Sequence, residues 1–98
     1  MGGAFLTFTY VLRGDADGKW YTGSTRDLRA RLRQHIEGRV RSTASRRPLQ
    51  LIYYEACVSS IDAFRRERFL KTGKGKRFLR KRLADFFSGL RSNKLERH

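Results

Sequence analysis

The sequence has few residues of several kinds, and each shortage excludes a class of protein. Its one cysteine, Cys57, cannot form an internal disulfide, so nothing favours an oxidising compartment. No apolar run approaches the ~20 residues that a membrane span needs. The N-terminus lacks the basic segment and the small-residue cleavage site of a signal peptide. One proline and no low-complexity tract leave little room for a linker. We therefore expect a bacterial-type cytoplasmic protein, with one domain over residues 1–88 and a polar tail over residues 89–98.

Acidic residues are scarce as well, which makes charge the strongest signal in the composition. Nine Asp and Glu face 23 Lys and Arg, and the formal net charge is +14. A polyanion is the expected partner of such a chain, and it would be nucleoid-associated when bound to DNA. Arg outnumbers Lys by 17 to 6. The guanidinium fork suits bidentate phosphate contacts, although a GC-rich genome also favours Arg. A solubilising surface or an acidic membrane is the alternative.

Three segments have the composition of strands. Residues 5–13 and 19–24 are rich in aromatic, aliphatic and Thr side chains, and the Gly- and Asp-containing segment between them predicts a hairpin turn. Residues 49–57 form a third continuous run of strand formers. If the turn is symmetric, Tyr10 lies opposite Tyr21, and the period of two places both phenols on one face.

Three further segments have the periodicity of helices. Residues 27–37 carry an apolar stripe, with Ser24, Thr25 or Asp27 as candidate N-caps and Gly38 as the stop. A second helix is expected from Ser59 or Ser60 to about residue 71, and a third over residues 76–87, after two glycines. The predicted class is α+β: a small three-stranded antiparallel sheet flanked by helices, in the order β-β-α-β-α-α.

Two charged side chains stand out against the helical pattern. Glu67 falls inside the apolar arc of the second helix, where a carboxylate needs a compensating cation, either a structural ion pair or a metal. Arg31 lies at the edge of the first stripe, one turn before His35. An arginine there is either a snorkelling side chain or a functional cation.

Taken in order, these residues resemble the GIY-YIG nuclease superfamily, and its small single-domain members most closely. The motifs are Phe8-Thr9-Tyr10, Tyr21-Thr22-Gly23, Arg31, His35 and Glu67. Phe8-Thr9 stands where the first family motif has Gly-Ile, a difference that bears on substrate fit more than on chemistry. The similarity covers roughly residues 5–83.

The resemblance implies a metal-dependent endonuclease that hydrolyses DNA phosphodiester bonds. By analogy, Glu67 would hold a single Mg²⁺ or Mn²⁺, an ion that suits one carboxylate plus waters and substrate phosphate. Tyr10 would be the general base and would need nearby positive charge to ionise at neutral pH. Arg31 would supply that charge and bind the phosphate, Tyr21 would orient the phosphate or the water, and His35 would assist proton transfer or contact a phosphate.

The substrate implied is DNA, branched, damaged or otherwise distorted, cut with structural or weak sequence preference, and DNA repair is one setting for it. RNA is less favoured. No small-molecule cofactor is expected, and the protein would be a monomer or weak dimer. Backbone contacts would come from a basic loop and from the third helix, a solvated basic face being the alternative. The residues are Arg39, Arg41, Ser42, Thr43, Arg46 and Arg47, then Lys74, Lys76, Arg77, Arg80, Lys81 and Arg82.

A second hypothesis is a non-catalytic basic DNA- or RNA-binding module that retains the GIY-YIG fold. In that case Tyr10 and Tyr21 are a cross-strand packing pair, worth ~1 kcal/mol and needing no chemistry. The TGKGK segment at residues 72–76 lacks the spacing of a phosphate-binding loop and is rejected as one.

Overall fold

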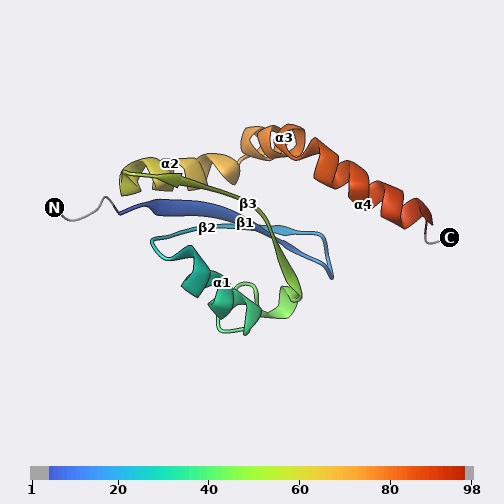
Figure 1. Ribbon diagram of the computed structural model, residues 1–98, viewed down its shortest axis with the longest axis horizontal. Helices are drawn as coiled ribbons and strands as arrows, with labels where there is room; N and C mark the ends of the chain where they lie inside the picture. Colours follow the sequence, from blue (N-terminus) through green and yellow to red (C-terminus); the bar gives the residue numbers. More distant parts are fainter. Residues whose placement is uncertain (1–4, 97–98) are drawn as a thin grey trace. The chain divides into compact units, whose positions relative to one another are not determined.

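The computed structural model describes the backbone of residues 5–96 and the side chains of residues 5–90 (Figure 1). The chain divides into two compact units at the Arg68–Phe69 boundary. No helix within residues 5–96 has the length and apolarity that crossing a membrane requires. The elements, in chain order, are β1 (Thr7–Gly14), β2 (Trp20–Thr25), α1 (Leu28–Ile36), a 3-10 turn (Ala44–Arg46), β3 (Leu49–Cys57), α2 (Ser60–Leu70), α3 (Gly73–Arg82) and α4 (Ala84–Glu96).

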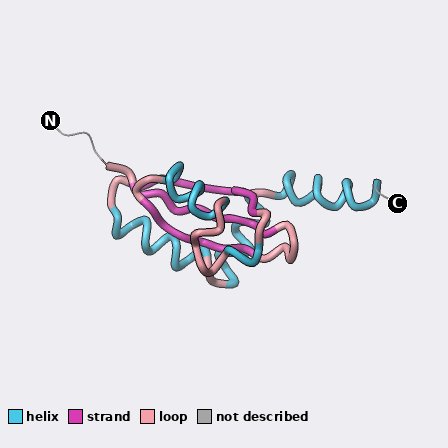
Figure 2. Tube along the Cα trace, turned by 90° about the horizontal axis from the view of Figure 1, so that it is seen from below, coloured by secondary structure: helices cyan, strands magenta, loops and turns pink. Residues whose placement is uncertain are grey.

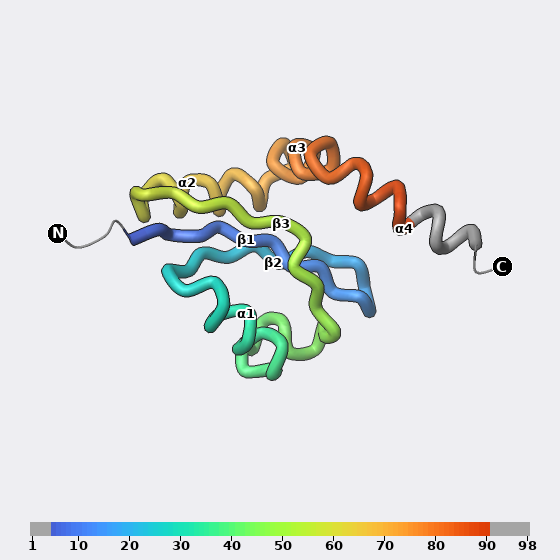
Figure 3. Tube along the Cα trace, in the orientation of Figure 1, coloured from blue at the N-terminus to red at the C-terminus, as the bar shows by residue number. Residues whose placement is uncertain are grey.

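The three strands form one antiparallel sheet in the order β2-β1-β3, which confirms the predicted fold class. Figure 3 shows β1 lying between β3 and β2, and Figure 2 shows the three strands side by side. β1 is central because it is the most continuously buried strand, with Tyr10, Val11 and Leu12 all at most 2% exposed. Two-sided burial of this kind suits a strand that is paired along both edges.

The first unit has a helix against each face of the sheet (Figure 1). On one face, the Thr9 hydroxyl donates to the Ala63 carbonyl at 3.0 Å and ties β1 to α2. On the other face, His35 of α1 packs against Tyr10 and Tyr21, with ring centroids 5.6 and 5.0 Å away. Odd and even positions of β1 therefore serve two separate packing layers.

The hairpin register differs from the predicted one. Tyr10 lies opposite Gly23, and Leu12 lies opposite Tyr21, so the two tyrosines are diagonal neighbours. The hairpin turn lies later in the chain than a symmetric turn would. The reason is that Gly18 adopts a left-handed φ of 69° and Asp17 accepts a hydrogen bond from the Lys19 amide at 2.9 Å. The shift is an even number of residues, so both phenols still share a face, with centroids 6.2 Å apart.

The ends of α1 are set by two residues named among the sequence candidates. Asp27 is the N-cap, since its carboxylate accepts from the Ala30 amide at 3.0 Å. Ser24 is not the cap, because its hydroxyl is directed to α2 instead. Gly38, with φ of 77°, ends the helix after Glu37, as expected of a glycine at that position.

The second unit corrects the predicted third helix. The expected helix over residues 76–87 is two helices, α3 and α4, which separate at Leu83. The two glycines expected to precede the helix lie inside α3, which Thr72 caps by accepting from the Gly75 amide at 3.1 Å. Residues 89–96, expected to form a tail, belong to α4, and residues 97 and 98 lie outside the described residues.

Gly75 allows the chain to approach itself closely where α2 gives way to α3. A Cβ at this position would overlap the Phe69 carbonyl and lie 2.6 Å from Leu70 Cα, both of them backbone atoms. Gly73 is different, because the nearest atom to its Cβ would be the flexible Arg77 guanidinium at 3.7 Å.

We therefore predict opposite effects for two neighbouring substitutions. Gly75→Ala should destabilise the protein by about 2 kcal/mol or more, since backbone must move to admit the methyl group. Gly73→Ala should be neutral or stabilising by up to ~1 kcal/mol, because it restricts only the unfolded chain. Urea unfolding of both variants checks this, and equal midpoints would contradict it.

Candidate active site

The centre of the candidate site is an aromatic cluster between β1, β2 and α1. Tyr10 is 1% exposed and His35 is fully buried, whereas Tyr21 is half-buried. The imidazole meets both phenol rings edge-on. Three of the predicted site residues are thus in mutual contact.

A chain of hydrogen bonds connects this cluster to the loop after α1. Tyr10 Oη lies 2.9 Å from His35 Nε2, and His35 Nδ1 lies 2.7 Å from Thr43 Oγ1. The Thr43 hydroxyl donates to the Val40 carbonyl at 3.4 Å. Because the Thr43 hydroxyl proton is used in that bond, its oxygen must accept from His35, so His35 Nδ1–H is assigned as the donor. His35 Nε2 then accepts from the Tyr10 hydroxyl.

Burial keeps both ends of the Tyr10–His35 bond uncharged at neutral pH. It lowers the pKa of His35 to about 4, and the nearby positive charge of Arg31 acts in the same direction. Burial also raises the pKa of Tyr10 to about 12, against the opposing effect of a hydrogen bond with Arg31. Tyr10 is therefore a phenol, not a phenolate, in this structure.

Arg31 supplies positive charge to the cluster. The hydrogen bond that the guanidinium donates to the Tyr10 oxygen raises the pKa of Arg31, and Tyr21 contributes in the same sense. The guanidinium also donates from Nη1 to Gln34 Oε1 at 2.8 Å, which fixes its position on α1. A half-buried cation beside two hydroxyls is suited to binding an anionic oxygen.

Gly23 provides the space for the Tyr10 hydroxyl. A Cβ at this position would lie 2.6 Å from Tyr10 Oη, 2.8 Å from its Cζ and 3.1 Å from Tyr21 Cε1. The Tyr10 ring therefore approaches the backbone of β2 closely, and the absence of a side chain at Gly23 is what admits it.

Glu67 reaches the sheet from the α2 side, the face opposite the tyrosines. Its half-buried carboxylate accepts a 2.5 Å hydrogen bond from the hydroxyl of Ser24. Ser24 is adjacent to Gly23 on β2, which is an edge strand. The Glu67 carboxylate and the phenols therefore lie near the same edge strand, β2, but on opposite faces of the sheet.

The donor set around Glu67 limits what kind of metal site it could form. Among the described side chains, no three His, Cys, Asp or Glu residues lie close enough to share an ion. One carboxylate is compatible with Mg²⁺, which keeps several waters and takes its other ligands from substrate phosphate. It does not suit zinc, which requires three or four protein ligands.

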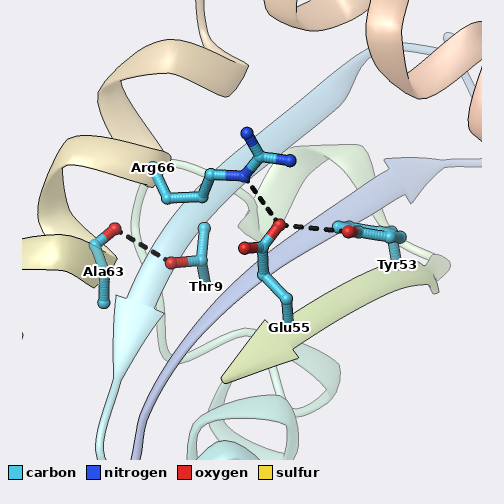
Figure 4. Close-up of polar contacts among 5 residues, drawn as sticks. All are labelled: Thr9, Tyr53, Glu55, Ala63 and Arg66. Atoms are coloured by element: carbon cyan, nitrogen blue, oxygen red, sulfur yellow. Dashed lines mark hydrogen bonds and ion pairs between the residues drawn. The ribbon is translucent and has the colours of Figure 1, made fainter. Parts of the chain in front are cut away.

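A different acid forms the ion pair that anchors α2. Glu55 Oε1 accepts from Arg66 Nε at 2.8 Å and from the Tyr53 hydroxyl at 3.0 Å (Figure 4). This pair joins β3 to α2 and raises the pKa of Arg66. Sequence reasoning missed it, although alternation along β3 places Tyr53 and Glu55 on one face.

The residues predicted to contact nucleic acid differ in their exposure to solvent. Thr43 is fully buried under His35, so its hydroxyl supports the imidazole and does not face solvent. Arg46 is half-buried. The remaining members are exposed: Arg39, Arg41, Ser42 and Arg47 in the loop of the first unit, and Lys74, Lys76, Arg77, Arg80, Lys81 and Arg82 on α3 of the second.

The fold and the cluster define a small α+β domain that gathers an arginine, a histidine and two tyrosines on one face of a three-stranded sheet, over β1 and β2. The family model described as the GIY-YIG catalytic domain matches residues 6–82. The chain belongs to this family, which implies a nuclease-like function.

The chain is also similar to curated proteins and to one solved structure. UPF0213 proteins of Staphylococcus epidermidis and Staphylococcus aureus are each 36% identical over 66 residues, which cover 66% of this chain and 79% of the relative. The solution NMR structure of a UPF0213 protein from Bacillus halodurans is 32% identical, with a TM-score of 0.49. That match covers 76% of this chain and 81% of the other.

The pKa of His35 predicts acid sensitivity. Because the pKa of His35 in the folded protein, about 4, lies below the usual histidine pKa of 6.5, the unfolded state binds more protons between these limits. Stability should be full above pH 6.5 and should fall by about 3 kcal/mol as the pH drops to 4.

His35→Gln should remove this part of the pH dependence, whatever its effect on absolute stability. Urea unfolding of both proteins from pH 7 to 4 gives the two slopes. Identical slopes would mean that His35 is not the buried neutral group described above.

Proposed function

We propose that the protein is a metal-dependent endonuclease that hydrolyses DNA phosphodiester bonds with structural or weak sequence preference. The observation that carries the proposal is the placement of Arg31 beside two tyrosine hydroxyls, one of which donates to a neutral histidine. Hydrolysis of a phosphodiester needs an anion-binding cation and a route for the proton of the attacking water. This cluster offers both.

Arg31 and Tyr21 are proposed to hold the scissile phosphate. The guanidinium can make two parallel hydrogen bonds to phosphate oxygens, which fixes the orientation of the group. Tyr21 is half-buried, so its hydroxyl remains accessible to a ligand. Because both side chains are packed against Tyr10 before any substrate binds, little reorganisation is required.

Tyr10 is proposed to act as the base through His35. A phenol with a pKa of about 12 keeps its own proton at neutral pH, so it does not readily accept another proton by itself. The Tyr10 oxygen can take the proton of water as its own proton moves to His35 Nε2, 2.9 Å away. Thr43 keeps the imidazole in the tautomer that can receive it.

Glu67 is the proposed ligand of one Mg²⁺ or Mn²⁺. The ion would polarise the phosphate and stabilise the departing oxygen. Ser24 holds the carboxylate at β2, an edge strand. Gly23 is the adjacent residue on that strand, and the phenols lie on its other face. The exposed arginines of the loop would contact the nucleic-acid backbone, which adds affinity but little sequence selection.

One observation favours a second candidate, a DNA- or RNA-binding module without catalysis. Tyr10 is 1% exposed and keeps its proton, as a tyrosine used only for packing would. In that case Arg31 binds a backbone phosphate without cutting, and Glu67 only stabilises α2 through Ser24.

Cleavage by a Glu67→Gln variant separates the two candidates. The amide retains the size of the side chain and a partner for Ser24, but it removes the charge a metal ligand needs. We predict that nicking of supercoiled plasmid and of a labelled branched DNA falls more than about 100-fold, beyond the 10–100-fold typical of groups that only support a ligand. DNA affinity should be kept.

Asp62→Asn is the matched control, since Asp62 is an exposed acid on the same helix. It should cut at the wild-type rate, and EDTA should stop both proteins. Wild-type protein that binds these DNAs and cuts none of them with Mg²⁺ or Mn²⁺ would establish the binding-module candidate instead.

A further inference from the structure

The face of the sheet that carries the tyrosine cluster continues onto β3 as a second aromatic pair. Tyr54 lies directly opposite Tyr10 in the β1–β3 register, so both side chains belong to this face. Phe8, two residues before Tyr10, packs on Tyr54 with ring centroids 6.1 Å apart and planes tilted by 54°.

Tyr54 and Tyr10 differ sharply in exposure. Tyr10 is 1% exposed, whereas Tyr54 is 53% exposed. β3 is an edge strand, so Tyr54 stands at the margin of the sheet, where a ligand can reach it. Phe8 covers part of the ring and limits its movement, so holding a ligand there costs little side-chain entropy.

The position of Tyr54 relative to the phosphate-binding groups is set by the strand order. The Tyr10 hydroxyl lies over Gly23 on β2, and Tyr54 lies on the other side of β1. Two strand spacings, ~10 Å, therefore separate Gly23 from Tyr54 across the sheet. A ligand whose anion rests beside the Tyr10 hydroxyl would need to span about this distance to reach the exposed ring.

We propose that Tyr54, backed by Phe8, stacks on an unpaired base of the nucleic acid whose phosphate Arg31 binds. The inference rests on the proposed function and deepens it, because it names the substrate class: nucleic acid with an unpaired nucleotide beside the bound phosphate. A base inside a duplex already stacks on both faces, so it has no free face for the ring. An unpaired base does.

The charge of the chain explains why an aromatic contact matters for selection. A net charge of +14 attracts any nucleic acid through its backbone and does not distinguish paired from unpaired strands. Stacking of a base on an aromatic side chain contributes to binding whatever the base, so the selection would be for structure and not for sequence. Tyr54 supplies the discrimination that the arginines cannot.

The test compares affinities for two DNAs in EDTA, where no cutting occurs. One DNA is a fully paired duplex, and the other is the same duplex with a short single-stranded gap that contains 2-aminopurine. Wild-type protein should prefer the gapped DNA and quench the fluorescence of the 2-aminopurine. Tyr54→Leu should lose about 5- to 150-fold in affinity for the gapped DNA, the range expected for one stacked base, and should lose the quenching.

Two further variants make the result specific. Tyr54→Phe keeps the ring and should retain both the preference and the quenching. Phe64→Leu is the matched control, because Phe64 is also 53% exposed but lies on α2, which packs on the opposite face of the sheet. It should behave as wild type, and all variants should bind the duplex within about twofold of wild type.

Three outcomes would overturn the inference: equal wild-type affinity for the two DNAs, a Tyr54→Leu variant that still prefers the gap, or an equal loss on both DNAs. An undiminished preference would indicate that the exposed ring serves another contact, such as a protein partner. Failure of the proposed nuclease activity is distinguishable, because a protein that never cuts can still show Tyr54-dependent preference in EDTA.

Discussion

The burial of the Tyr10 hydroxyl is the constraint on which the rest of the site depends. A polar group that is 1% exposed must have a partner and a space. His35 provides the partner, and Gly23 provides the space by lacking a side chain. His35 in turn requires Thr43, so a strand, a helix and a loop are held by one line of hydrogen bonds. Arg31 gains its position beside the phenols from the same arrangement.

The sheet separates two kinds of polar chemistry. On the α1 side, neutral hydroxyls and an imidazole surround a cation, an environment suited to an anionic ligand. On the α2 side, the carboxylate of Glu55 is satisfied by Arg66 and Tyr53, as a structural group should be. Glu67 stands between these cases, because it is bound by Ser24 at the edge where the two faces meet. Ser24 can hold Glu67 there because β2 is an edge strand. On a central strand the carboxylate would be buried.

Much of this arrangement could be predicted from the sequence. Alternation along β1 gave the shared face of the tyrosines, and the helical stripe gave α1 with Arg31 and His35 on it. The hairpin register could not be predicted, because it depends on the left-handed φ of Gly18. Neither could the role of Thr43, since a threonine in an arginine-rich loop has the composition of a surface contact. The break between α3 and α4 could not be predicted either, because Leu83, where the backbone leaves the helical region with φ of −108° and ψ of 29°, is an ordinary helix former.

The hydrogen bond between His35 and Thr43 also bears on how this protein can vary among its relatives. Surface loops usually tolerate insertions and deletions, and they are where homologous chains differ most in length. Here the two residues are eight positions apart and both are fully buried. The segment between them must span a fixed path, so its length is constrained although most of its side chains are not. Arginines can be exchanged along this loop during evolution, but residues cannot be added to it without releasing the imidazole.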